Sequence, residues 1–320
     1  VRPDRGSLPA AEARTHHHHL EAMILTICLN PTFQNTMLFD SFSEGAVNRC
    51  TQHYLDASGK GMNTARIANQ LGKEAILLSH LGGPRKDEML ALCAKDRVKV
   101  LHTDSHSPIR TCTTIISNGV CTELVQNPEA VSEGCEEGIR LLFSEALPKS
   151  EAIIICGTRA PGYSKNLYAD FVREAKKMGK FVLLDIKGED LLSCLPYSPD
   201  VIKPNFSEFV ETFFGERVPE QGEDKNLVAR VQGKMESLHH EFGCMSVISR
   251  GKHDLLIFDK RAQTIKIEQA EVVNTIGCGD TLNASLTIAL LEGHSLQQSA
   301  KIATNHATMQ AKTIHPGSFV

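Results

Sequence analysis

The segment from Glu151 to Asp185 reads EAIIICGTRAPGYSKNLYADFVREAKKMGKFVLLD, and its pattern decides the fold class. The apolar runs 151–156 and 181–185 predict two buried strands, because strands covered on both faces are apolar almost throughout. Between them, the spacing of the apolar residues in 165–178 predicts a helix. A strand, a helix and a second strand in this order predict a parallel pair joined by a crossover helix.

The same alternation continues from residue 133 to the C-terminus and also opens the chain. Further strands are predicted at 23–29, 75–79, 201–203 and 244–249, and further helices at 62–71, 226–242, 281–291 and 296–312. Repeated strand–helix units predict an α/β fold with a doubly wound, mostly parallel sheet. Ligands bind beyond the carboxyl ends of the strands in such sheets, so the glycine-rich and polar motifs that follow strands should converge at one edge.

Two β-prone segments without helices of their own interrupt this alternation, at about 34–57 and 108–126. Within the second, Asn118-Gly119 separates two strand-like runs and predicts a tight hairpin. We expect the two segments to pair as a small sheet that stands off the main domain as a lid. An exposed edge strand can pair with another chain, so such a lid would favour a homodimer.

Composition narrows the classes of protein that need consideration. The chain has 320 residues, 41% of them hydrophobic and 22% charged, which suits one large globular domain. A formal net charge of −4 supplies no basic field, so nucleic acid is not an expected partner. No apolar run reaches the length that spans a bilayer, so a membrane protein is not expected either.

The cysteines and the N-terminus also carry information. Ten cysteines without a CxxC pair fit neither a zinc site nor a disulfide scaffold, so we expect reduced thiols in the cytoplasm. Residues 1–22 contain four adjacent histidines at 16–19, which we interpret as an expression-tag remnant rather than a metal site. The folded domain is therefore expected over residues 23–320.

The stretch 274–280, NTIGCGD, carries the most chemical information. Its two glycines permit a sharp turn whose N–H groups point into one space, and the helix that follows adds the positive end of its dipole. This arrangement suits the charge that develops on a transferring phosphoryl group. Asp280 could accept a proton from an attacking hydroxyl, or it could be an ordinary helix cap. At the same helix start, Cys278 could have a lowered thiol pKa, or it could be a buried, unreactive residue.

Two more motifs follow strands. SGKGMN at 58–63 is a glycine turn entering a helix, but it is no P-loop, which would need Gly at 54 and Ser or Thr at 61. In KPNFSE at 203–208, Asn205 and Glu208 begin a helix. Their spacing allows a capping box, and it also allows two oxygen-bearing side chains to organise a hydrated Mg²⁺ ion.

Together these motifs resemble the PfkB branch of the ribokinase-like sugar kinases, over about residues 23–317. The resemblance rests on their order and spacing. The segments that carry it are 29–31 (LNP), 58–63 (SGKGMN), 157–162 (GTRAPG), 203–208 (KPNFSE), 249–251 (SRG) and 277–280 (GCGD). Within the family, 110–112 and 122–125 are most similar to 1-phosphofructokinase and tagatose-6-phosphate kinase.

The resemblance implies an ATP-dependent kinase that phosphorylates a ketohexose phosphate, either fructose 1-phosphate or tagatose 6-phosphate, to the bisphosphate. It implies Asp280 as general base and Mg²⁺ and ATP phosphates near Asn205 and Glu208, with the metal held through water. The implied anion-hole residues are Gly277, Cys278 and Gly279, and the implied nucleotide-binding residues are Ser249, Gly251 and Asn305. The implied sugar-phosphate residues are Gln34, Gly59, Lys60, Asn63, Arg110 and Arg49, the last of which could equally be an ordinary surface cation.

The chain departs from the family pattern at several positions. Gln34 stands where an aspartate usually binds sugar hydroxyls, and Arg159-Ala160 replaces the usual Leu-Pro. Ser58, Asp254 and Cys278 are further departures. Gln34 keeps open a non-catalytic sugar-phosphate or nucleotide-binding protein, and a kinase for an unphosphorylated sugar or a nucleoside is a further alternative. A binder has no need of a base, so Asp280 favours the kinase.

Overall fold

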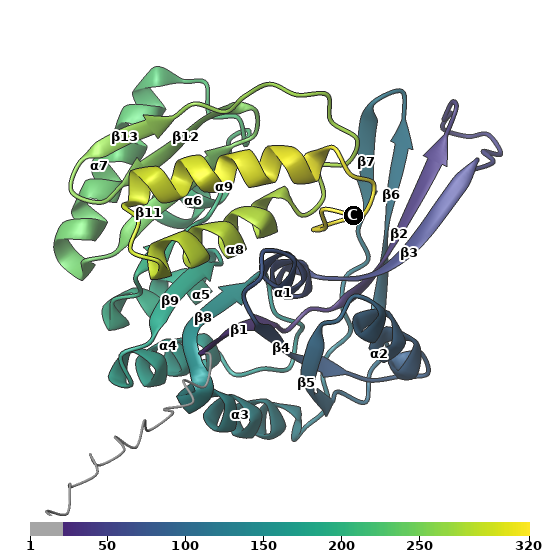
Figure 1. The fold of residues 1–320 in the computed structure, drawn as a ribbon, viewed down its shortest axis with the longest axis horizontal. Helices are drawn as coiled ribbons and strands as arrows, with labels where there is room; N and C mark the ends of the chain where they lie inside the picture. Colours follow the sequence, from purple (N-terminus) through teal and green to yellow (C-terminus); the bar gives the residue numbers. More distant parts are fainter. Residues whose placement is uncertain (1–21) are drawn as a thin grey trace, which may run out of the picture.

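The computed structural model describes residues 22–320, which form a nine-stranded sheet with helices on both faces and a separate four-stranded sheet (Figure 1). The expected tag remnant and its histidines lie outside the described residues. The strands are β1 (Met23–Cys28), β2 (Thr32–Phe39), β3 (Gln52–Ser58), β4 (Ala75–Leu81), β5 (Lys99–Asp104), β6 (Arg110–Ser117), β7 (Val120–Leu124), β8 (Ser150–Cys156), β9 (Phe181–Asp185), β10 (Val201–Ile202), β11 (Met245–Arg250), β12 (His253–Phe258) and β13 (Ala262–Ile265). The helices are α1 (Lys60–Gln70), α2 (Lys86–Lys95), α3 (Cys135–Ala146), α4 (Leu167–Lys177), α5 (Gly188–Cys194), α6 (Phe206–Phe214), α7 (Lys225–Phe242), α8 (Cys278–Leu291) and α9 (Leu296–Ala311), with short 3₁₀ turns at Leu147–Lys149 and Leu195–Tyr197.

The large sheet has the strand order β13-β12-β11-β10-β9-β8-β1-β4-β5. Neighbouring strands from β11 to β5 are parallel, which confirms the doubly wound α/β class predicted from the sequence. Strand β12 and the edge strand β13 are antiparallel and were not predicted. Their local signal is a two-residue turn, Gly251-Lys252, between the paired residues Arg250 and His253.

Side chains of the parallel strands alternate between two hydrophobic cores. In β1, Leu25 and Ile27 belong to the core covered by α3 to α7. Ile24 and Cys28 belong to the opposite core, covered by α1, α2, α8 and α9. Each fully buried aliphatic side chain of this kind contributes about 1.5–3 kcal/mol. Because both faces are covered, the strands read as unbroken apolar runs, which is why they could be predicted.

The small sheet has the order β3-β2-β6-β7 and joins the two β-prone segments of the sequence. Strand β2 pairs antiparallel with β3 and parallel with β6. The predicted hairpin joins β6 to β7, with positive φ at Asn118 and Gly119. Strand β2 follows β1 after a three-residue connection, and β3 runs through Gly59 directly into α1. The small sheet is therefore rooted at the carboxyl end of the central strands (Figure 1).

In the part of the chain that the structure describes, no helix combines the length and the apolar character needed to cross a membrane.

Candidate active site

A cleft of about 850 Å³ lies between the small sheet and the carboxyl ends of the parallel strands. This is the edge at which ligands bind in open α/β sheets. The sequence-predicted site residues that line it are Gln34, Gly59, Lys60, Asn63, Arg110, Asn205, Glu208, Ser249, Gly251, Gly277, Cys278, Gly279 and Asp280. The structure thus brings together motifs that are separated by up to about 250 positions in the chain.

Two predicted site residues do not line this cleft. Arg49 is exposed in the loop between β2 and β3, outside the residues that line the cleft. Asn305 is exposed on α9. The residues of α9 that line the cleft are Thr304, Ala307, Thr308 and Ala311. These four share one helical face by their i, i+3, i+4, i+7 spacing, and Asn305 points away from that face.

The glycine turn before α8 forms the floor of the cleft. Gly277 has a φ of 91°, and a side chain there would collide with the backbone of Gly317. The N–H groups of Gly279 and Asp280 make no hydrogen bond to any residue between 22 and 320. These free donors at a helix N-terminus can stabilise an anion in the cleft.

Asp280 lies in the first turn of α8 and is only 4% exposed. Its Oδ2 atom accepts a hydrogen bond of 3.1 Å from Nδ2 of Asn63, and its buried Oδ1 atom has no partner among the described residues. Burial raises the pKa of Asp280 to about 6, although Lys60, Lys203 and Asn63 oppose that rise. A carboxylate with this pKa is ionised at neutral pH and can still accept a proton.

A second buried carboxylate, Asp185, ends strand β9. Its Oδ2 atom accepts hydrogen bonds from Nζ of Lys60 at 3.2 Å and from Nδ2 of Asn283 at 2.8 Å, and Nζ of Lys203 lies 3.7 Å away. Burial alone would raise the pKa of Asp185, but Lys203, Lys60 and Asn283 together lower it. Although Asp185 stands at the end of a strand, its side chain is buried.

Lys203 and Asn283 were missed as individual site residues. Lys203 is the first residue of the motif 203–208, and Asn283 belongs to none of the motifs. The available signal for Lys203 is a charged residue that directly follows a buried strand. Nothing in the local sequence around Asn283 distinguishes it from other polar residues of a helix, because its partner lies 98 positions away.

Asn205 and Glu208 form the capping box of α6. The Asn205 N–H donates to Oε1 of Glu208 at 3.0 Å, and the Glu208 N–H donates to Oδ1 of Asn205 at 2.8 Å. Oε2 of Glu208 makes no hydrogen bond within residues 22–320, and both residues line the cleft. Glu208 can therefore cap α6 through Oε1 and still offer Oε2 to a hydrated metal ion.

The oxygen atoms of Asn205 and Glu208 suit Mg²⁺ better than a metal ion that needs a full set of protein ligands. Among the described residues, no group of three or more His, Cys, Asp or Glu side chains is arranged to hold a metal ion. Mg²⁺ keeps several waters and takes only one or two carboxylates alongside phosphate oxygens. The unpaired Oε2 of Glu208 fits that requirement.

Gln34 and Arg110 line the part of the cleft beneath the small sheet. Nε2 of Gln34 donates to Oγ1 of Thr114 at 2.6 Å. Two nitrogens of Arg110 donate to backbone oxygens, Nη2 to Asn30 at 3.1 Å and Nη1 to Gln126 at 3.2 Å. The Nε atom of Arg110 is buried without a partner among the described residues. The guanidinium is thus held by the backbone at two of its nitrogens, while its buried Nε stays unpaired among the described residues.

Two departures from the family pattern can now be placed. Arg159 does not line the cleft, since it pairs with Asp190 at 2.9 Å and lies over the ring of Tyr168. Arg159, which stands where the family usually has leucine, therefore contributes no side chain to the wall of the cleft. For Cys278, the structure favours the second alternative, a buried and unreactive thiol, because burial, aided by Asp280, raises the thiol pKa to about 12.

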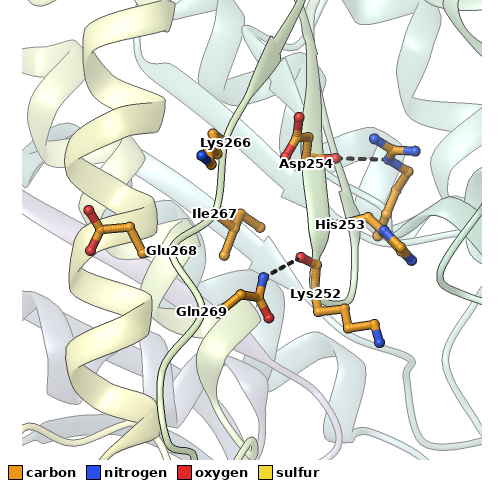
Figure 2. Close-up of a pocket in the computed structure, with 8 residues that line it drawn as sticks. Lys252, His253, Asp254, Lys266, Ile267, Glu268 and Gln269 are labelled. Atoms are coloured by element: carbon orange, nitrogen blue, oxygen red, sulfur yellow. Dashed lines mark hydrogen bonds between the residues drawn. The ribbon is translucent and has the colours of Figure 1, made fainter.

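The cleft continues past Ile267 into an outer groove of about 710 Å³ beside β12. Figure 2 shows that Lys252 and Lys266 point in different directions there, and that Gln269 donates to the Lys252 carbonyl, at 3.1 Å. Because the charged groups diverge, this groove presents no converging set of ligands. The site chemistry is concentrated in the inner cleft.

A doubly wound sheet with a small side sheet, above a cleft floored by a glycine turn and a buried aspartate, defines the class of ribokinase-like kinases. The chain belongs within that class to the pfkB family carbohydrate kinases, whose family model matches residues 29–318.

Solved structures share this fold. Phosphofructokinase-2 from Escherichia coli, in complex with substrates and products, has a TM-score of 0.79 at 20% identity, over 91% of this chain and 93% of that chain. A possible 1-phosphofructokinase from Thermotoga maritima has a TM-score of 0.81 at 18% identity, over 92% of this chain and 93% of that chain. At these identities the likeness extends to the fold.

Proposed function

We propose that this carbohydrate kinase transfers the γ-phosphoryl group of ATP to a hydroxyl of a ketohexose phosphate, either fructose 1-phosphate or tagatose 6-phosphate. The observation that carries this proposal is the environment of Asp280. A buried carboxylate with one held oxygen and one free oxygen lies in the first turn of a helix whose free N–H groups face the same cleft. A protein that only binds its ligand needs no such group.

In the proposed reaction, the carboxylate of Asp280 accepts the proton of the sugar hydroxyl. The sugar oxygen forms a bond to the γ-phosphorus, and the bond from that phosphorus to the oxygen of ADP breaks. Negative charge on the transferring group is met by the N–H groups of Gly279 and Asp280 and by Lys203. Phosphoryl transfer relies chiefly on such positioning and charge stabilisation.

We place the phosphate of the sugar substrate near Lys60 and Arg110. Both side chains line the cleft, and the guanidinium of Arg110 is the kind of group that binds phosphate oxygens. Gln34 adds no charge where the family pattern has a carboxylate, which favours an anionic sugar.

ATP would lie along the wall formed by Thr304, Ala307 and Ala311, with its phosphates directed towards α6 and α8. Mg²⁺ would be held through water by Glu208 and Asn205, and its chemistry there is to neutralise charge on the phosphates. Asp185 keeps Lys60 and Lys203 in place beside that position.

The test measures ADP release with fructose 1-phosphate, tagatose 6-phosphate and fructose 6-phosphate, and with free fructose, tagatose and ribose. The Asp280→Asn variant is the matched control for release that does not depend on the proposed base. The proposal predicts the highest kcat/KM for a ketohexose phosphate. Preference for a free sugar or a nucleoside would overturn the substrate class, and no transfer to any acceptor would favour the non-catalytic alternative.

A further inference from the structure

The side-chain amide of Asn63 is held from both ends. Its Oδ1 atom accepts hydrogen bonds from Oγ of Ser58 and from Nη1 of Arg66, each at 3.0 Å. Its Nδ2 atom donates to Oδ2 of Asp280 at 3.1 Å. An arginine can only donate and an ionised carboxylate can only accept, so these two neighbours allow a single orientation of the amide.

Arg66 is buried, with 2% exposure, and does not line the cleft. Besides Asn63, it donates to Oδ2 of Asp96 at 2.8 Å, to the carbonyl of Pro316 at 2.9 Å and to the carbonyl of Ala57. Its guanidinium is thus fixed by partners on several segments. A donor held in this way keeps its hydrogen bond to Asn63 at a constant geometry.

The same arginine also connects to the turn that carries Asp280. Pro316 accepts from Arg66, and the next residue, Gly317, donates its N–H to the Ile276 carbonyl at 3.3 Å. Gly317 packs against both Gly277 and Asn63. Arg66 therefore fixes the amide that holds Asp280 and also the segment that supports the turn before it.

We infer that Arg66, together with Ser58, is a positioning residue for phosphoryl transfer: the two donors fix the amide of Asn63, and this amide holds Oδ2 of Asp280 and so fixes the orientation of the carboxylate that accepts the proton. The inference rests on the proposed function for its catalytic meaning. Its structural part concerns only which oxygen of Asp280 is held, and can be tested without turnover.

The expected effect follows from the chemistry of the amide. When either donor is removed, the Asn63 amide is held less firmly, so its hydrogen bond to Oδ2 of Asp280 weakens. The hydrogen bond from Asn63 lowers the pKa of Asp280, so its loss adds to the rise caused by burial. Loss of one buried hydrogen bond should reduce kcat about five- to tenfold.

The experiment compares wild type with Arg66→Lys and Ser58→Ala. Arg66→Lys keeps the positive charge but cannot hold all the partners of a planar guanidinium. Ser58→Ala removes one hydroxyl and tests the inference if Arg66→Lys does not fold. The matched control is Ser150→Ala, which removes a buried hydroxyl that donates to the Ala146 carbonyl at 2.8 Å, outside the cleft.

Two readouts are needed. The first is the titration of Asp280 followed by ¹³C NMR of labelled aspartate, with its signal assigned by its absence in Asp280→Asn. The second is the pH profile of kcat. Both variants should move the titration and the acidic limb of the profile to higher pH and lower kcat, with sugar KM changed less than kcat, whereas Ser150→Ala should match wild type.

Folded variants whose Asp280 titrates as in wild type would overturn the inference, whatever their activity. A wild-type protein that transfers no phosphoryl group would refute the proposed function, yet the NMR titration would still decide whether Arg66 and Ser58 act on Asp280.

Discussion

Nζ of Lys203 lies 3.7 Å from Oδ2 of Asp185, and both side chains are 3% exposed. Nζ of Lys60 approaches the same oxygen at 3.2 Å, so one buried carboxylate holds two ammonium groups at the base of the cleft. A Cβ atom on Gly279 would lie 3.7 Å from Nζ of Lys203, which places this lysine against the glycine turn. The Asp185 carboxylate therefore sets the position of cations that face the phosphoryl-binding floor.

Replacing Asp185 by Asn should destabilise the fold, because Lys203 would be left as a buried, uncompensated charge. We expect the free energy of unfolding at neutral pH to fall by about 3–5 kcal/mol, measured by urea denaturation. The control is Glu216→Gln, which breaks an exposed pair with Arg230 and should cost no more than about 1 kcal/mol. Equal losses for the two variants would show that the Asp185 pair does not stabilise the protein.

The raised pKa of Asp280, about 6, predicts a pH dependence with a definite sign. The folded state binds this proton more tightly than the unfolded state, so protonation of Asp280 stabilises the fold as the pH falls through 6. Asp280→Asn should therefore raise the free energy of unfolding by about 1–3 kcal/mol at pH 7, and the gain should vanish near pH 4. A gain that does not change with pH would show that the pKa of Asp280 is not raised.

The role of Glu208 can be separated from its role in the helix cap. Gln can replace Glu in a capping box, so Glu208→Gln should leave stability nearly unchanged while it removes the charge. We expect a severalfold higher Mg²⁺ concentration for half-maximal rate, because one carboxylate that organises the hydrated ion is lost. A Mg²⁺ titration identical to that of wild type would assign Glu208 to the cap alone.

Arg110 and Arg49 form a matched pair of cations, one inside the cleft and one outside it. Arg110→Ala should lower kcat/KM for phosphorylated sugars by about tenfold or more, because a charge-assisted hydrogen bond to phosphate is lost. The same change should have little effect on free sugars, and Arg49→Ala should affect neither class. Equal losses for phosphorylated and free sugars would remove Arg110 from phosphate recognition.

Much of the fold could be predicted because strands that are buried on both faces appear in the sequence as unbroken apolar runs. The apolar runs of β1, β8 and β9 and the period of α4 are readable one segment at a time. Strand β5 was missed because most of its residues are only partly buried, so its sequence lacks the same apolar run. Strand β13 is short and carries exposed residues, so its sequence is equally weak.

The site was predicted in part, for a related physical reason. Glycine turns and the aspartate at a helix start have local patterns, so the motif around Asp280 was visible. Its hydrogen bond to Asn63 joins positions 217 residues apart, and no local pattern encodes it. The outward course of Arg159 towards Asp190 likewise depends on tertiary packing. The fold, and not the residues adjacent in the sequence, decides which side chains contact a buried carboxylate.

The central claim is that Asp280 is the base of a phosphoryl-transfer reaction, and the steady-state rate of Asp280→Asn tests it most directly. With ATP, Mg²⁺ and the preferred ketohexose phosphate, kcat should fall by about 10²–10⁴-fold, the usual effect of a positioned base. Substrate KM should change little, since the carboxylate acts mainly in the transition state. A folded variant that retains more than half of the wild-type kcat would contradict the account.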